Sequence, residues 1–167
     1  MRSPVNALAA AGIDAATVAD VVLTHLHYDH AGCLDAFPAA IFHLQDKEMA
    51  YSTGRPMCHR ALRLPVDLDD VLSAVRHVFA GQVRFHDGTA AISPGVTLHL
   101  VGGHSGGMQV VRVWTARGWV VLASDVAHYW ANIRTRNPFP LVADVVAMAE
   151  GWRICEELAD GPDHVIP

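Results

Sequence analysis

The pattern of apolar and polar positions divides the chain into helical and extended segments. Residues 67–79 carry apolar side chains at helical spacing behind Asp67, and residues 142–158 show the same period, so both segments predict amphipathic helices. Between 83 and 122 the apolar runs are short and are separated by glycine-containing pairs, which predicts a meander of strands. Shorter elements are also expected: helices at 4–11, 34–37 and 45–51, strands at 21–24, 40–44 and 164–166, and loops at 52–66 and 126–140.

This order of elements predicts a layered α/β fold. We see no repeat, low-complexity tract or interdomain linker. A length of 167 residues with 51% hydrophobic content is enough for a real core. We therefore expect one domain over residues 1–167.

The apolar strand at 21–24 runs directly into His25, His27, Asp29 and His30. Side chains two positions apart on extended backbone share a face, so His25 and His27 can converge on one point. If the following loop turns back, Asp29 and His30 can aim at a second point nearby. Imidazole and carboxylate groups suit zinc or another first-row divalent metal.

The alternative is a polar loop in a histidine-rich chain. Eleven of the 167 residues are His, so clusters arise by chance more easily than usual. Three His and one Asp within six positions, at the end of an apolar strand, still favour a metal site.

Two later segments carry further candidate ligands. His104 stands in the glycine-rich turn 102–107, where glycines let the backbone pass close to another group while one imidazole projects inward. Asp125 ends an apolar strand whose last residues are small. The alternatives are an incidental His in a hairpin and an Asp that caps a turn.

The string at 25–30, followed by Ala31 and Gly32, resembles the HxHxDH signature of the metallo-β-lactamase-fold hydrolases. Its flanks are most similar to the N-acyl-homoserine lactonase branch. The resemblance implies an α/β fold of the αββα sandwich type and two divalent metal ions, expected to be Zn²⁺. The ligands it implies are His25, His27 and His104 for one ion, Asp29 and His30 for the second, and Asp125 for both.

The family normally supplies a further His to the second metal from a turn after the last strand, and this chain ends at Pro167, where that turn would be expected next. The family also has a β-hairpin region before the helix at 4–11. We therefore expect a chain truncated at both ends, an incomplete sandwich and a weakened second metal site. Sheet edges exposed in this way would favour pairing with another chain, so a homodimer is a further expectation.

The activity implied by the resemblance is the opening of a small, acyl-homoserine-lactone-like ring, hence quorum quenching, by a hydroxide that bridges the metals. Asp29 is expected to pass a proton to the leaving alkoxide. The lactonase branch has a substrate-binding Tyr at the position that holds His128 here, and Tyr129 follows. Either side chain could donate to the oxyanion, and Tyr129 could instead form part of the pocket wall.

Two other functions stay open. One is a thioesterase of glyoxalase II type, whose site uses similar ligands. The other is an inactive metal-binding fragment that lacks the C-terminal His ligand.

Composition adds a few constraints. A net charge of −5 and a pI of about 6.1 give no reason to expect nucleic acid or an anionic membrane as partner, so a small ester or lactone is the easier fit. Three well-separated cysteines without a CxxC pair indicate a reducing cytoplasm rather than a disulfide framework. No segment has the pattern of a signal peptide or a membrane span.

Overall fold

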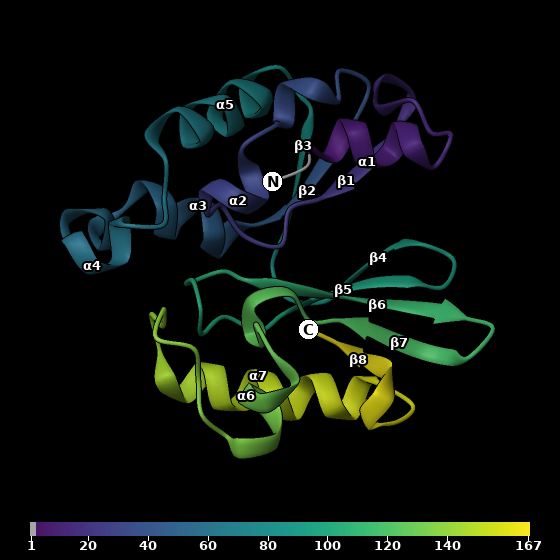
Figure 1. The fold of residues 1–167 in the computed structure, drawn as a ribbon. Coiled ribbons are helices and arrows are strands. Elements are labelled where there is room, and N and C mark those ends of the chain that lie inside the picture. The colour runs from purple at the N-terminus through teal and green to yellow at the C-terminus, as the bar shows by residue number, and fades with distance from the viewer. Residues whose placement is uncertain (1–2) are drawn as a thin grey trace.

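The computed structural model describes residues 3–167, which form two β-sheets placed face to face between two layers of helices (Figure 1). This is the αββα arrangement that the family resemblance implied. The first sheet consists of parallel strands in the order β1 (Asp20–Val22), β2 (Ile41–Gln45) and β3 (Val83–His86). The second has the order β4 (Ala90–Ser93), β5 (Val96–Leu100), β6 (Gln109–Thr115), β7 (Gly118–Leu122) and β8 (Val165–Ile166).

The second sheet is antiparallel from β4 to β7, and β8 joins β7 in parallel. Helices on the side of the first sheet are α1 (Pro4–Ala10), α2 (Tyr28–Ala31), α3 (Asp46–Thr53), α4 (Arg60–Arg63) and α5 (Leu68–Phe79). Those on the side of the second sheet are α6 (Trp130–Thr135) and α7 (Val145–Leu158). Short 3₁₀ helices occur at Ala15–Thr17, Leu34–Ala36, Arg55–Cys58, Ser124–Val126 and Pro162–His164.

The two long helices begin at carboxylate caps. Asp67 accepts a hydrogen bond from the Asp69 N–H at 2.8 Å, and Asp144 accepts one from the Ala147 N–H at 3.0 Å. Each cap satisfies an amide that has no partner within its helix, which fixes the start of α5 and of α7.

Each helix layer packs its own core against its sheet. On one side the core includes Phe42 and Leu44 of β2, and on the other it includes Met148 and Trp152 of α7.

A buried amide pair joins the two sheets. Gln45 on β2 donates through Nε2 to Gln109 Oε1 on β6 at 2.8 Å. Gln109 Nε2 in turn donates to the carbonyls of Leu23 at 2.8 Å and His43 at 3.0 Å. Because both glutamines are fully buried, these bonds fix how the sheets face each other.

Three sequence-based expectations were wrong in detail. β3 was expected within the meander but pairs with β2 in the first sheet, so the chain changes sheets between β3 and β4. The expected loop at 52–66 contains a 3₁₀ turn and α4, and the expected loop at 126–140 contains α6. These helices span four to six residues, too few for an apolar period to appear in the sequence.

Within residues 3–167, no helix has both the length and the apolar content needed to cross a membrane. Cys33, Cys58 and Cys155 are free thiols.

Candidate metal centre

The predicted ligands from both halves of the chain converge at one end of the two facing sheets. After β1, the segment 23–27 carries His25 and His27 with their side chains buried, while Leu26 between them points into the core. The chain then turns into α2, which presents Asp29 and His30. The alternation of ligand and core residues is the pattern expected where extended backbone separates a core from a polar site.

Four side chains form the first group: His25, His27, His104 and Asp125. One potential ligand atom from each lies within 4.8 Å of those from the others. His104 Nε2 is 2.9 Å from His27 Nδ1 and 3.1 Å from Asp125 Oδ2, and His25 Nε2 is 3.7 Å from the same oxygen.

Asp29, His30 and Asp125 form a second group that meets the same distance limit. His30 Nε2 lies 3.7 Å from Asp29 Oδ2 and 3.4 Å from Asp125 Oδ1. Asp125 therefore turns Oδ2 toward the first group and Oδ1 toward the second, which is the geometry required of a carboxylate shared by two ions.

The donor set fits a divalent metal. Nε2 of His25, which lies 3.7 Å from Asp125 Oδ2, is buried and has no hydrogen-bond partner among the described residues. Leaving such a nitrogen buried and unpaired is costly, and coordination to a metal would satisfy it. Three imidazoles with one carboxylate are ligands typical of zinc.

The surroundings of His25 and His27 favour neutral imidazoles. Burial, followed by the proximity of the other histidines, holds the pKa of His25 well below its ordinary value. Burial, with His104 adding to it, lowers the pKa of His27 to about 3. A neutral imidazole is the form that binds a metal, so these two nitrogens need lose no proton at neutral pH.

In the second group, the pKa of the histidine shifts in the opposite direction. Burial lowers the pKa of His30, but the hydrogen bond to Asp125 and the nearby carboxylates outweigh it, so the pKa is raised. Burial also opposes ionisation of Asp125, yet the imidazoles of His104, His128 and His30, which lie within hydrogen-bonding distance of its oxygens, dominate and hold its pKa well below the usual range. Asp125 is therefore an anion at the centre of the cluster.

Surrounding groups orient the imidazoles. The Nδ1–H of His104 donates to the Leu141 carbonyl at 2.8 Å, which leaves Nε2 directed at the cluster. The hydroxyl of Thr24 lies 3.1 Å from His25 Nδ1 and receives a hydrogen bond from Ser124 at 3.1 Å. Ser124 itself has a φ of 48°, a left-handed conformation uncommon for serine, directly before Asp125.

Close packing explains why glycines rather than larger residues flank His104. A Cβ on Gly103 would stand 2.6 Å from the backbone of Met148 on α7, and one on Gly107 would stand 1.9 Å from the backbone nitrogen of Glu48 on α3. The turn is therefore held between a helix of each layer. Sequence reasoning predicted a close backbone approach here but could not identify the partners.

His128 lies inside the cluster and Tyr129 lies at its margin. His128 Nε2 is 3.2 Å from Asp125 Oδ2, and its ring stacks on Phe139 with centroids 4.1 Å apart. The Tyr129 side chain is 62% exposed at the start of α6.

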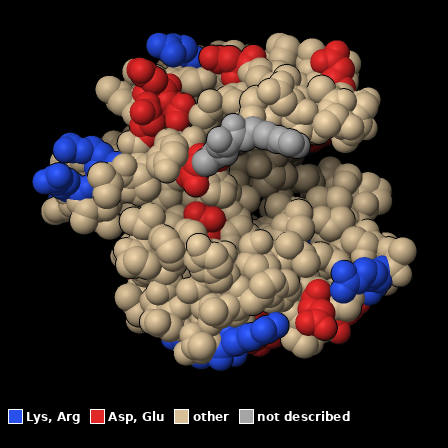
Figure 2. All heavy atoms as spheres, viewed as in Figure 1, with Lys and Arg blue, Asp and Glu red and all other residues tan. Residues whose placement is uncertain are grey.

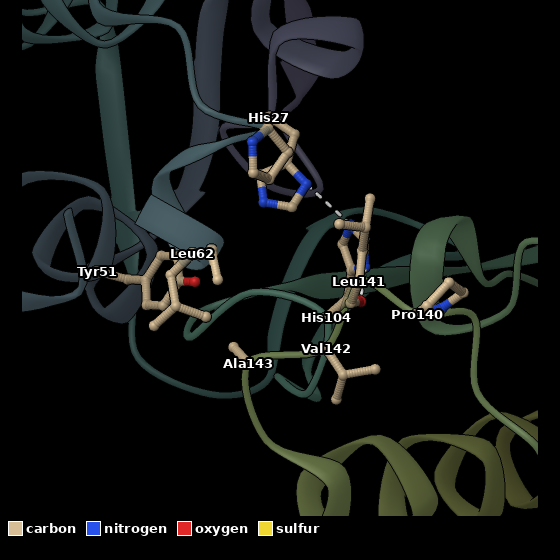
Figure 3. Close-up of a pocket in the computed structure, with 10 residues that line it drawn as sticks. His27, Tyr51, Leu62, His104, Pro140, Leu141, Val142 and Ala143 are labelled. Carbon is tan, nitrogen blue, oxygen red and sulfur yellow. Dashed lines mark hydrogen bonds between the residues drawn. The ribbon is translucent and has the colours of Figure 1, made fainter. Parts of the chain in front are cut away.

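A pocket of about 90 Å³ opens beside the imidazoles of His27 and His104 (Figure 3). Its walls are mainly apolar and come from α3, α4 and the loop before α7, with Tyr51, Ala61, Leu62, Pro65, Pro140, Leu141, Val142 and Ala143 contributing. The wider face is hollowed between the helix layers, with Lys and Arg side chains at its margins (Figure 2).

A family model of the metallo-beta-lactamase superfamily matches residues 1–166, so the chain belongs to this superfamily. No match was found among curated protein sequences.

Solved structures show the same fold. An N-acyl homoserine lactone hydrolase with N-hexanoyl-L-homoserine at its catalytic metal center superposes with a TM-score of 0.78, at 23% identity over 98% of this chain and 60% of its own. A dizinc quorum-quenching lactonase gives a TM-score of 0.72 at 20% identity, over 93% of this chain and 58% of its own. A probable metal-dependent hydrolase from Staphylococcus aureus gives a TM-score of 0.75 at 16% identity, over 89% of this chain and 53% of its own. The chain thus spans about 60% of the length of the lactonases it matches.

Proposed function

We propose that this protein is a metal-dependent hydrolase that opens a small lactone of the acyl-homoserine lactone class, using two zinc ions. The observation that carries the proposal is the position of Asp125, whose two oxygens face two different groups of potential ligands. Metal ions that share one carboxylate are suited to the hydrolysis of an acyl bond. The lactonase structures that share the fold support the choice of a lactone.

In this proposal His25, His27 and His104 hold one ion, Asp29 and His30 hold the other, and Asp125 contacts both. Ions bound there would polarise a carbonyl oxygen and lower the pKa of a water molecule from 15.7 toward about 7. The protein's own contribution includes the imidazoles of His25 and His104, whose remaining nitrogens are held by the Thr24 hydroxyl and the Leu141 carbonyl.

Proton transfer is assigned to Asp29. Ring opening adds water to the acyl carbon, breaks the bond to the ring oxygen and requires a proton on the leaving oxygen. Asp29 is about one-third exposed, unlike the buried imidazoles of the first group, so a substrate can reach its carboxylate. It would take a proton from the attacking water and return it to the leaving oxygen.

His128 is the better placed of the two candidates for contact with the substrate carbonyl. Its side chain is 20% exposed with Nε2 3.2 Å from Asp125 Oδ2, and stacking on Phe139 fixes its ring. Tyr129, being largely exposed, is assigned to the rim of the pocket. The neutral, mostly apolar walls of the adjoining pocket suit an uncharged acyl group.

The experiment is a turnover assay of the zinc-loaded chain on a panel of acyl-homoserine lactones and simpler lactones. We expect ring opening that a chelator abolishes and that zinc restores. A His128→Phe variant should lower kcat by about 10-fold or more, because a hydrogen-bond donor to the developing oxyanion is lost. Tyr129→Phe is the matched control and should stay close to wild type.

Acyl-glutathione thioesters belong in the same panel. Turnover of these compounds without turnover of lactones would replace the lactonase with a thioesterase. A folded, zinc-loaded chain that hydrolyses neither class would contradict the proposal and leave a metal-binding fragment.

A further inference from the structure

Glu48 is a fully buried carboxylate in the first turn of α3. Its Oε1 accepts the backbone N–H of Leu26 at 2.9 Å. Its Oε2 accepts the Ser105 hydroxyl at 2.6 Å and the backbone N–H of Gly107 at 2.9 Å. Three donors from two distant segments therefore converge on one side chain.

These donors alternate with the predicted metal ligands. Leu26 stands between His25 and His27, and Ser105 directly follows His104. Glu48 thus bonds to both ligand-bearing segments of the first group without contacting a ligand atom itself. A shift of either segment away from the other would break one of its hydrogen bonds.

We propose that Glu48 is a positioning residue that fixes the spacing between the 25–27 segment and the 102–107 turn, and thereby sets the affinity and geometry of the first metal site. The inference rests on the proposed function only insofar as these residues bind metal. It does not depend on which substrate is hydrolysed.

Between Glu and Gln, only a carboxylate can accept all three hydrogen bonds. Both oxygens of Glu48 act purely as acceptors, whereas the amide of a glutamine offers one acceptor and one donor group. Whichever way Gln were turned, its NH₂ would face at least one backbone N–H, either that of Leu26 or that of Gly107. A buried N–H would then lose its partner, and the two segments would separate to relieve the conflict.

The 102–107 turn packs closely against α3, and this packing supports the inference. Gly107 approaches the backbone of Glu48 so closely that a Cβ would stand 1.9 Å from its nitrogen, and a Cβ on Gly106 would stand 2.6 Å from the ring of Tyr51. The turn that carries His104 therefore packs directly on helix α3. Burial raises the pKa of Glu48, and its three donors oppose that rise by stabilising the anion.

The experiment measures metal binding directly. Zn²⁺ affinity is determined by competition with a chromophoric chelator, and the visible absorption of the Co²⁺-loaded chain reports the ligand geometry, for the wild type and for Glu48→Gln. We expect Glu48→Gln to lower Zn²⁺ affinity by about 10- to 100-fold, the range found when groups that orient metal ligands are removed, and to change the Co²⁺ spectrum.

His43 provides the matched control. It is also buried, lies on β2 and has its imidazole 2.9 Å from Asp20 Oδ1 and 3.0 Å from His86 Nε2. His43→Leu should lower thermal stability but leave Zn²⁺ affinity and the Co²⁺ spectrum of the folded chain close to wild type, because neither partner adjoins a predicted ligand. A purely structural role for Glu48 would make the two variants alike in all three measurements.

Ser105→Ala covers the case in which Glu48→Gln does not fold. It removes one donor and leaves the carboxylate in place, and we expect about a threefold loss of affinity with a smaller spectral change. The proposal is overturned if a folded Glu48→Gln, or Ser105→Ala in its stead, retains wild-type affinity and spectrum. If the wild-type chain binds zinc with the dependence on Glu48 described but opens no lactone, the proposed reaction fails and the role of Glu48 stands.

Discussion

At the scale of single residues, the centre depends on histidines that are kept neutral by their surroundings. His25 and His27 are buried beside other imidazoles, so protonation of either would place a charge where neither water nor a counter-ion fully compensates it. The stability of the rest of the fold offsets the cost of burying these imidazoles, which stay neutral and able to bind a metal.

This arrangement has a consequence for the pH dependence of stability. A His whose pKa is lower in the folded chain than its ordinary value of 6.5 contributes stability that is lost as the pH falls, because the unfolded chain takes up the proton first. For His27 the window extends from about pH 6.5 down to about 3. His30, with a raised pKa, acts in the opposite direction and offsets part of the loss.

We therefore expect the metal-free chain to lose free energy of unfolding between pH 7 and pH 5, with His27 contributing up to about 1.4 kcal/mol per pH unit. His27→Asn should show a shallower slope over the same interval. Urea unfolding at several pH values in the presence of a chelator measures both curves. Parallel curves for the two proteins would show that His27 does not titrate in this way.

The clustering of these candidate ligands could be predicted from the sequence, because His25, His27, Asp29 and His30 are close together in the chain and follow a recognisable strand. The residues that hold them could not be. Glu48 contacts the site only because the fold brings α3 under two remote segments, and nothing in its local sequence distinguishes it from a surface glutamate in a first helical turn.

At the scale of elements, the glycine-rich turn after β5 is where packing is most restrictive. Gly103 has a φ of 91°, while Gly107 has an ordinary φ but no room for a side chain. The turn contacts Met148 of α7 on one side and Glu48 of α3 on the other. His104 can reach the cluster only while both contacts are kept.

Gly107→Ala should accordingly destabilise the chain by about 3 kcal/mol or more, since the clash is with backbone that cannot rotate away. Gly81→Ala is the matched control. Gly81 has a φ of 74° but open space around it, so only backbone strain of about 1–2 kcal/mol is expected. Chemical denaturation of both variants measures the difference, and equal losses would mean that the turn does not pack against α3 as described.

Elements long enough to show a period were predicted well from the sequence. Helix α5 begins at the expected cap Asp67, and the strands from β4 to β7 follow the expected runs. The placement of β3 was not predictable, because a short apolar strand carries no signal for which sheet it joins. Helices α4 and α6 are too short to show a period.

At the scale of the whole molecule, the centre exists because the two sheets face each other. The 25–30 segment follows β1 of the first sheet, whereas His104 and Asp125 follow β5 and β7 of the second. The buried pair of Gln45 and Gln109 fixes this relation between the sheets. Its partners lie far apart in the sequence, so the assembly could be predicted from family resemblance but not from local pattern.

The most direct test of this assembly is the zinc content of the folded 167-residue chain after equilibration with Zn²⁺ and removal of the excess. We expect zinc to bind, with two ions per chain at saturation. His104→Ala should lose zinc from the first group, and Asp125→Asn should lose more, because Asp125 faces both groups. A folded wild-type chain that retains no zinc, or variants that retain as much as the wild type, would contradict a metal centre built from the two halves of the fold.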